Sequence, residues 1–360
     1  MPFPWFQEYA CLRDLSAILT LTGVTVLPAG EMLSACTARM KGILVTTMKA
    51  VRAHAYGGPE VLRYEDVPKP EPGKGELLIK IHAAGINPSD WKVRAGYFKD
   101  FVPFPMPFVP GTALSGTVAA LGPEAQGFTI GQEVFGSSVF GRSGSYAEYT
   151  TTKPTLITAK PRSLDHIHAA AVPVSALAAW HALFGERMID PKPGQTILIH
   201  GAAGGVGSFA AQLAKWKGAR VIGTSSASNE SYLRELGVDQ VVDYRKQPFD
   251  EVVQNVDAVL DTIGGDVEKR SWNVLKPGGV LASLVAQKLT PPQNATPGLR
   301  GVAVSANLAN PHLAEIATLL DAGTVKVTVS DVLPLGEARR AQEMSESGHV
   351  RGKVVLNVAG

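Results

Sequence analysis

The chain has 360 residues, more than one ordinary domain needs, so its length predicts two folded domains. Hydrophobic residues make up 45% of it and charged residues 18%, which is typical of globular domains with a sizeable core. The formal net charge of +2 gives no reason to expect a nucleic-acid partner, and no apolar run is long enough to span a bilayer. The 2 cysteines, Cys11 and Cys36, precede the predicted globular region, which excludes a disulfide framework and a cysteine metal site within it.

Residues 1–47 are predicted to be an N-terminal extension of the folded protein. The apolar stretch Ile18–Leu27 and the small residues before Cys36 are similar to a lipoprotein export signal. The segment in front of them carries acidic residues, whereas an export signal begins with positive charge. The folded sequence begins cleanly at Met48. We therefore expect the extension to be disordered or mis-started, and the protein to be cytoplasmic.

Short strand-like runs dominate the chain from Met48 to about Pro161. Glycine and proline turns separate these runs, a pattern that predicts a small, partly open β-barrel. The runs are Leu77–Ile81, Gly116–Ala120, Glu133–Phe135 and Tyr146–Tyr149.

An apolar loop with 4 prolines interrupts this region at Phe101–Gly111. Prolines at this density exclude a helix or the interior of a sheet, so we expect an extended segment. It would present the side chains of Phe101, Phe104, Met106 and Phe108. These side chains could cover the barrel, or they could form an apolar wall for a flat hydrophobic substrate.

A glycine-rich turn joins a buried strand at Thr196–Ile199 to a helix at Ser208–Trp216. Such a turn leaves backbone N–H groups free beside the positive end of a helix dipole, which suits a pyrophosphate. The usual first glycine of the dinucleotide fingerprint is replaced by Ala202. The residues assigned to cofactor binding here are Ala203, Gly204, Gly205, Val206 and Gly207.

Strands and helices then alternate at the pace of a doubly wound parallel sheet, the Rossmann arrangement of an α/β fold. The predicted strands are Arg220–Thr224, Gln240–Asp243, Ala258–Asp261 and Val280–Val285, and the predicted helices are Glu230–Leu236 and Glu268–Leu275. Ligands bind at the carboxyl ends of such strands. The further candidate cofactor contacts are therefore Ile263, Ser283, Leu284 and Val285.

The end of the second strand indicates which nicotinamide cofactor binds. NAD-binding versions carry an acid about 20 residues past the glycines, where it accepts from the ribose hydroxyls. Here no acid stands before Glu230, and hydroxyls and backbone donors would accept a 2′-phosphate. The candidate contacts are Thr224, Ser225, Ser226, Tyr244 against the adenine, and Arg245 as a cation. The sequence therefore favours NADPH, although Ser226 or Ser228 could instead cap the next helix.

The last strand-like run, Gly352–Val358, follows a helix-like segment at Glu337–Ser345 and is predicted to pair back into the first domain. The expected domains are therefore a barrel built from residues 48–172 and 328–360, and a nucleotide-binding domain at residues 173–327.

Four motifs in chain order carry a resemblance to a known family. They are Ala84–Trp91 (AGINPSDW), Val109–Gly116 (VPGTALSG), Gly201–Gly207 (GAAGGVG) and Gly348–Lys353 (GHVRGK). Together they resemble the zinc-independent quinone oxidoreductase (zeta-crystallin-like) branch of the medium-chain dehydrogenase/reductase superfamily. The resemblance implies a GroES-like barrel, an inserted Rossmann domain, an NADPH site in the cleft between them, and often a homodimer. It also implies that Arg351 or Lys353 returns to the cofactor phosphates.

The resemblance also bears on metal binding. Zinc-dependent relatives take their catalytic ligands at the positions of Asn87, Thr112 with Ala113, and Val174, and none of these is an ordinary zinc ligand. His166 and His168 are two apart, so on a helix they would point to different faces. We therefore expect no metal.

Without a metal, the resemblance implies hydride transfer to a quinone or an α,β-unsaturated carbonyl compound. Asn87 is implied to lie beside the nicotinamide ribose and the substrate carbonyl, although Asn-Pro is also a turn former. Tyr97 is a second catalytic candidate as proton donor. In relatives one residue separates the glycine from this tyrosine, whereas here Tyr97 follows Gly96 directly and Phe98 takes the next position. Water could therefore donate the proton instead. The alternatives are an enoyl-thioester reductase and an NADPH-binding crystallin-like protein with little turnover.

Overall fold

The structure, a computed structural model, describes residues 46–100, 102–304 and 312–359, and the residues from Thr47 onward pack as one unit. The predicted extension and Phe101 lie outside the described residues, except for the last residues before Met48. None of the described helices has both the length and the apolar character of a membrane span.

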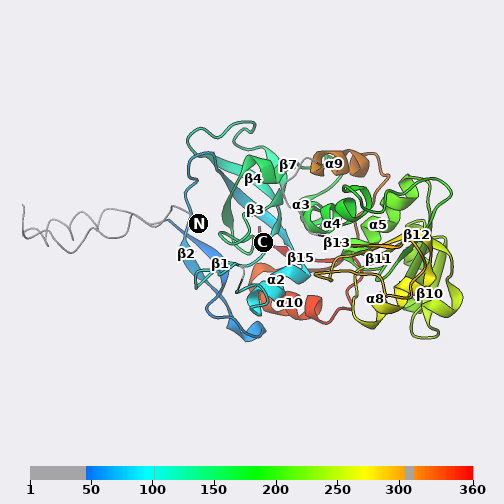
Figure 1. The fold of residues 1–360 in the computed structure, drawn as a ribbon. Helices are drawn as coiled ribbons and strands as arrows, with labels where there is room; N and C mark the ends of the chain where they lie inside the picture. The colour runs from blue at the N-terminus through cyan, green and yellow to red at the C-terminus, as the bar shows by residue number, and fades with distance from the viewer. Residues whose placement is uncertain (1–45, 101, 305–311, 360) are drawn as a thin grey trace, which may run out of the picture. The chain divides into compact units, whose positions relative to one another are not determined.

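The first part of the fold is a barrel-like sheet that is antiparallel except for the parallel pair β14 and β15 (Figure 1). Its 7 strands run in the order β14-β15-β3-β4-β5-β7, with β6 pairing to β3, and a separate two-stranded sheet joins β1 and β2. The last strand pairs antiparallel to β3, with Val355 opposite Gly85, as the sequence predicted. The strand bounds are β1 Thr47–Ala53, β2 Leu62–Pro68, β3 Leu77–Gly85, β4 Ala113–Leu121, β5 Glu133–Ser137, β6 Tyr149–Thr152, β7 Ile157–Ala159, β14 Val329–Pro334 and β15 Lys353–Asn357.

The second part is a parallel sheet of 6 strands in the order β10-β9-β8-β11-β12-β13. The strand order reverses between β8 and β11, which creates the crevice where ligands bind in such sheets. The predicted α/β class with GroES-like and Rossmann parts is confirmed. The strand bounds are β8 Thr196–Ile199, β9 Arg220–Ser225, β10 Gln240–Asp243, β11 Val256–Asp261, β12 Leu275–Ser283 and β13 Arg300–Ala303.

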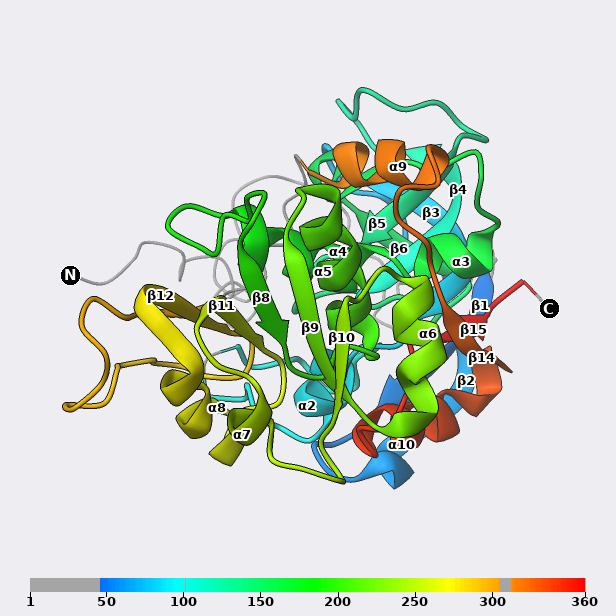
Figure 2. The same cartoon turned by 90° about the vertical axis from the view of Figure 1, so that its right-hand side faces the viewer.

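Helices cover both faces of the parallel sheet (Figure 2). Because side chains alternate along a strand, Ile197 and Ile199 of β8 pack with α4, α5 and α9, whereas Leu198 packs with α7 and the turn after α8. Strands buried on both faces explain the continuous apolar runs in the sequence. The helix bounds are α2 Pro88–Arg94, α3 His166–Ala170, α4 Pro173–Phe184, α5 Gly205–Trp216, α6 Glu230–Glu235, α7 Phe249–Val252, α8 Asp266–Ser271, α9 Leu313–Asp321 and α10 Ala338–Glu346.

The strand predicted at Tyr146–Tyr149 starts later than expected, at Tyr149, where β6 begins. The side chain of Tyr146 is fully buried, and its hydroxyl donates to Asp90 Oδ2 at 2.9 Å. Alternation of apolar and polar residues alone cannot distinguish a tyrosine that makes a buried hydrogen bond from an ordinary strand residue.

The helix predicted at Glu268–Leu275 is shorter than expected. It ends at Ser271, a 3₁₀ turn follows, and Leu275 already pairs with Val256 as the first residue of β12. The strand β13 was not predicted, because its segment Arg300–Ala303 has too few apolar residues to indicate a strand.

Candidate active site

The glycine-rich turn lies at the carboxyl end of β8 and starts the 12-residue helix α5. Gly201 has a φ of 66°, and a Cβ built at Gly207 would lie 2.3 Å from the carbonyl oxygen of Gly201, so both positions need glycine. Ala202 replaces the first glycine of the fingerprint, and its methyl group fills the space left by Gly223 of β9, where a Cβ would lie only 2.8 Å away. The departure from the fingerprint is therefore compensated on the neighbouring strand.

The end of β9 brings hydroxyls and a cation together. Ser225 Oγ donates to the carbonyl of Ser226, and the hydroxyls of Ser226 and Ser228 are 3.0 Å apart. Arg351 Nε donates to Asn229 Oδ1 at 2.7 Å, and its NH2 donates to Ser228 O at 2.9 Å. Ser226 makes no capping hydrogen bond, so the alternative that it caps the next helix is not what the structure shows.

Thr224, predicted to be a cofactor contact, directs its hydroxyl into the protein. Its side chain is buried, with Oγ1 3.1 Å from His200 Nδ1 and accepting from the N–H of Gly201. Burial lowers the pKa of His200 to about 4, so this ring is neutral at physiological pH. The Thr224 hydroxyl thus ties β9 to the glycine turn instead of facing outward.

Tyr244 and Arg245 follow β10 at the same edge of the sheet. The N–H of Tyr244 donates to Ser225 O at 3.2 Å, which places the tyrosine next to the end of β9. The Tyr244 side chain is exposed, and Arg245 Nε donates to its hydroxyl at 3.3 Å. The structure therefore brings these two predicted residues to Ser225.

Asp261, which was not predicted from the sequence, organises the turns after β11 and β12. Its Oδ1 accepts from the N–H groups of Ile263 and Gly264, both at 2.9 Å, and its Oδ2 accepts from Ser283 Oγ at 2.9 Å. The carboxylate is fully buried, while the side chains of Ile263 and Val285 are exposed. A buried acid at the end of an apolar strand was the signal available in the sequence.

The hydroxyl and backbone groups of the segment after β12 are already engaged. Ser283 Oγ, besides bonding to Asp261, accepts from the N–H of Val285 at 3.3 Å, and the N–H of Leu284 donates to Asp261 O at 3.0 Å. The predicted contacts Ser283 and Leu284 therefore shape the turn, and the Val285 side chain is the group of this segment that faces outward.

Asn87 connects β3 to α2 and is 1% exposed. Its N–H donates to Asp90 Oδ2 at 2.9 Å, and its Nδ2 donates to Gly85 O at 3.1 Å. Its Oδ1 accepts from Lys353 Nζ at 2.6 Å. As the residue before Pro88 it also starts the helix, so the turn-forming role and a fixed carboxamide coexist.

Lys353, expected to contact the cofactor phosphates, has its amino group beside Asn87. Its Nζ donates to the carbonyl of Ile86 and to Asn87 Oδ1, and the residue is 5% exposed. Its stem lies against Gly205 of the cofactor turn, where a Cβ would be 2.8 Å from Lys353 Cδ. Burial lowers its pKa to about 8, and the negative charge of Asp90 opposes this shift.

Asp90 was also not predicted from the sequence, although it stands 3 residues after Asn87 at the start of a helix, where a capping carboxylate is common. Besides the N–H of Asn87, it accepts from Tyr146 and from Thr112 Oγ1 at 3.3 Å. Burial raises its pKa to about 6, and these donors and Lys353 oppose that shift. Asp90 thus accepts a hydrogen bond from Thr112, which occupies a position where zinc-dependent relatives have a metal ligand.

Tyr97, the second catalytic candidate, lies in the turn after α2 and is 66% exposed. Its ring packs edge-on against Trp91 at 5.9 Å between centroids. The structure therefore places it on the surface, whereas Asn87 is buried.

The proline-rich loop covers part of the barrel and also contributes two phenylalanines to the lining of a pocket. Phe108 is buried against Ala53 and Val93 in the barrel, whereas Phe104 is half-buried. Phe104 lies 4.9 Å from Phe108 and 5.4 Å from Phe140 between ring centroids. A pocket next to Asp90 is lined by Val93, Phe104, Phe108, Thr112, Val139 and Phe140.

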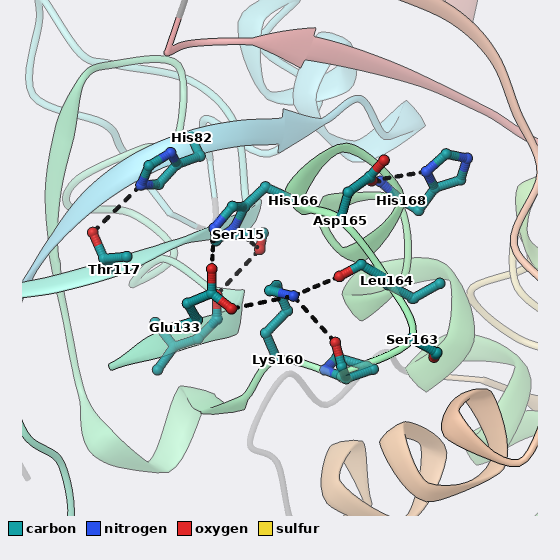
Figure 3. A network of polar contacts seen from close by, with 12 residues as sticks. His82, Ser115, Thr117, Glu133, Lys160, Ser163, Leu164, Asp165, His166 and His168 are labelled. Atoms are coloured by element: carbon teal, nitrogen blue, oxygen red, sulfur yellow. Dashed lines mark hydrogen bonds and ion pairs between the residues drawn. The ribbon is translucent and has the colours of Figure 1, made fainter. Parts of the chain in front are cut away.

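His166 and His168 have separate partners (Figure 3). His166 Nδ1 is 2.8 Å from Ser115 Oγ, and its Nε2 is 3.2 Å from a Glu133 oxygen. His168 Nδ1 is 2.8 Å from Asp165 Oδ1. This geometry agrees with the helical spacing argument. Among the described residues, no three His, Cys, Asp or Glu side chains gather as metal ligands do.

The last strand joins the two parts of the site. The N–H of Gly352 donates to Ala203 O at 2.8 Å, so β15 begins directly on the glycine turn and carries Lys353 to Asn87. A nucleotide-type turn at a switch point, joined to a barrel with a buried polar cluster, defines a nicotinamide-dependent oxidoreductase of the two-domain dehydrogenase type.

Comparisons with known proteins agree with this class. Family models match residues 73–162, described as alcohol dehydrogenase GroES-like domain, and residues 236–356, described as zinc-binding dehydrogenase. The 2-methylene-furan-3-one reductase of Solanum lycopersicum is 34% identical over 321 residues, covering 86% of this chain and 79% of the relative. The chloroplastic NADPH-dependent alkenal/one oxidoreductase of Arabidopsis thaliana is 33% identical over 320 residues, with coverage of 86% and 79%.

Among solved structures, the quinone oxidoreductase from Coxiella burnetii superposes with a TM-score of 0.78 at 34% identity, covering 87% of this chain and all of the other. The chain therefore belongs to the zinc-independent quinone oxidoreductase branch of the medium-chain dehydrogenase/reductase superfamily. The zinc in the matched description is a property of other members. Here the ligand positions hold an amide at Asn87, a hydroxyl at Thr112 and an alkyl group at Val174.

Proposed function

We propose that the protein is an NADPH-dependent, metal-free reductase of quinones or α,β-unsaturated carbonyl compounds. The observation that supports it most is the meeting of the glycine turn with the fixed carboxamide of Asn87 through β15. A bound nicotinamide would supply the hydride, and the protein would supply orientation and a dry, apolar surrounding. The Asn87 carboxamide has two Nδ2 hydrogens, of which Gly85 O takes one, so the other could donate to a substrate oxygen.

The residues of the turn fit a dinucleotide. A Cβ built at Gly204 would meet only the Gly201 carbonyl, at 3.3 Å, so the backbone is open to close approach on that side. The first N–H groups of α5 follow at once and suit a pyrophosphate. The candidate contacts remain Ala203 to Gly207, with Ser225, Ser226, Tyr244, Arg245, Ile263 and Val285 toward the two ends of the cofactor.

NADPH is preferred in this proposal because hydroxyls, and no carboxylate, follow the end of β9, and because Arg351, which precedes β15, bonds to the same segment. We expect Arg351→Ala to lower kcat/KM for NADPH about 10-fold or more while changing that for NADH little, since a 2′-phosphate–guanidinium pair is lost. Steady-state kinetics with both cofactors measure this. The matched control is Arg339→Ala on α10, whose guanidinium pairs with Glu343 on the surface. Equal losses with both cofactors would contradict a 2′-phosphate contact.

The test of the proposed function is NADPH consumption with a panel of acceptors. Loss of NADPH absorbance is followed with a 1,2-quinone, a 1,4-quinone, a short enone and a 2-enoyl thioester. We expect turnover with a quinone or the enone. Turnover confined to the thioester would favour the enoyl-thioester alternative, and in that case Tyr97→Phe should lower kcat. Tight NADPH binding without consumption of any acceptor would favour the crystallin-like binding protein.

A cytoplasmic homodimer is part of the same proposal. The edge strand β13 pairs only with β12 within the described chain, and a second copy could extend the sheet there. Light scattering coupled to gel filtration measures the mass, and a monomeric mass across the working concentration range would contradict the dimer.

A further inference from the structure

Lys353 buries an ammonium group whose hydrogen-bond acceptors are neutral oxygens, with the charge of Asp90 acting on it without a direct bond. The residue is 5% exposed, and its two hydrogen-bond acceptors are the carbonyl of Ile86 and Asn87 Oδ1. Removing an ammonium from water costs several kcal/mol, which neutral acceptors offset only in part. An apolar side chain of similar length would fill this space without that desolvation cost. The retained charge therefore indicates a task beyond packing.

The stem of Lys353 contacts the cofactor turn while its amino group contacts Asn87. Cδ lies against Gly205, and the preceding residue, Gly352, donates its N–H to Ala203 O. One side chain thus spans from the predicted pyrophosphate site to the predicted catalytic carboxamide.

The opposite side of Asn87 is fixed as well. Asp90 accepts from the backbone N–H of Asn87 and is itself held by Tyr146 and Thr112. With Lys353 on Oδ1 and Gly85 O on Nδ2, the carboxamide cannot flip without losing both hydrogen bonds. An ammonium on Oδ1 also withdraws electron density from the amide and makes its N–H a stronger donor.

From these contacts we propose that Lys353 is a positioning residue of the reductase, holding the Asn87 carboxamide in one orientation relative to the cofactor turn. The proposal rests on the proposed function for its catalytic consequence, but the contact itself does not depend on turnover. It also replaces the expectation that the Lys353 amino group binds the cofactor phosphates.

A double-mutant cycle tests the contact in the protein without cofactor. Lys353→Met keeps the stem and removes the ammonium, and Asn87→Ala removes the acceptor. If the two groups interact, their effects on the urea midpoint are not additive, because the second substitution removes an interaction already lost. Additive effects would overturn the contact whether or not the protein proves to be a reductase.

The same cycle in kcat tests positioning. We expect Lys353→Met to lower kcat about 10- to 100-fold, with a smaller change in the Kd of NADPH, and to have little further effect in the Asn87→Ala background. A comparable loss in both backgrounds would mean that Lys353 does not act through Asn87. A large loss of NADPH affinity with unchanged kcat would return it to a phosphate-binding role.

Lys160 provides a matched control (Figure 3). Its side chain is 7% exposed, and its amino group is held by the carbonyls of Pro161 and Leu164 and by Glu133. Lys160→Met removes a buried ammonium that has no partner in common with Asn87, so we expect its effects to add to those of Asn87→Ala in both cycles.

A pH profile gives a readout that packing alone would not change. The lowered pKa of Lys353, about 8, means that kcat of the wild type should fall as pH rises through about 8, when the cationic donor is lost. The titratable groups near it are Asp90, with a pKa of about 6, and Tyr146 behind it, with a pKa raised well above its ordinary value, so neither titrates there. In Lys353→Met this alkaline fall should be absent, and its persistence would contradict the proposal.

Discussion

Asn87→Ala is expected to lower kcat about 100-fold with a much smaller change in the Kd of NADPH, the scale of losing one donor to a developing oxyanion. The substitution removes the Nδ2 donor and leaves Lys353 Nζ with only the Ile86 carbonyl. Stopped-flow measurement of hydride transfer and fluorescence titration of NADPH separate the two effects. Because the buried ammonium loses an acceptor, some loss of thermal stability should accompany the change.

Asn87→Asp distinguishes a donor from a turn former. Aspartate starts helices as well as asparagine does, and its carboxylate can still accept from Lys353. It cannot donate to a substrate carbonyl when ionised. If Asn87 only forms the turn, Asn87→Asp should retain most of the wild-type kcat. If the carboxamide polarises the acceptor, its kcat should fall as far as that of Asn87→Ala.

The parts of the molecule that were predictable depend on short stretches of sequence. The glycine turn could be placed because an apolar strand, a glycine run and a helix follow one another within a few residues, and the backbone itself makes the site. The alternation of strands and helices likewise defined the parallel sheet. Even the replacement of a glycine by Ala202 left the turn intact, because Gly223 makes room for the methyl group.

The polar contacts around Asn87 and at the end of β9 were not predictable because they join distant parts of the chain. Lys353 and Asn87 are 266 positions apart, Tyr146 and Asp90 are 56 apart, and Arg351 and Asn229 are 122 apart. Lys353 and Arg351 reach their partners because β15 returns to β3 and starts on the glycine turn, whereas Tyr146 reaches Asp90 from the segment before β6. A resemblance could suggest that Lys353 matters, but not that its amino group donates to Ile86 O and Asn87 Oδ1.

Thr224 and Ser283 show the same limit on a shorter scale. Both stand at strand ends where ligands bind, and both were assigned to the cofactor for that reason. Their hydroxyls instead bond to buried groups, His200 and Asp261. Position along a strand predicts which edge a residue occupies, but the direction of a hydroxyl depends on the neighbouring strand's side chains.

Asp261→Ala is expected to lower the free energy of unfolding by about 3 kcal/mol or more, measured by urea unfolding. Its carboxylate accepts from Ser283 and from the N–H groups of Ile263 and Gly264, and alanine would leave these donors unpaired in a buried setting. Because these bonds shape the turns that carry Ile263 and Val285, NADPH affinity should fall as well.

Two variants show whether that loss comes from the hydrogen bonds of Asp261. Asp261→Asn keeps an oxygen for the two N–H donors, and the Ser283 hydroxyl can rotate to accept from the new amide, so most of the stability should return. Asp266→Ala removes a carboxylate whose side chain is 78% exposed at the start of α8, and should change stability by no more than about 0.5 kcal/mol. If Asp261→Asn unfolds as readily as Asp261→Ala, the negative charge is what stabilises the two turns, acting on the N–H dipoles that point toward it.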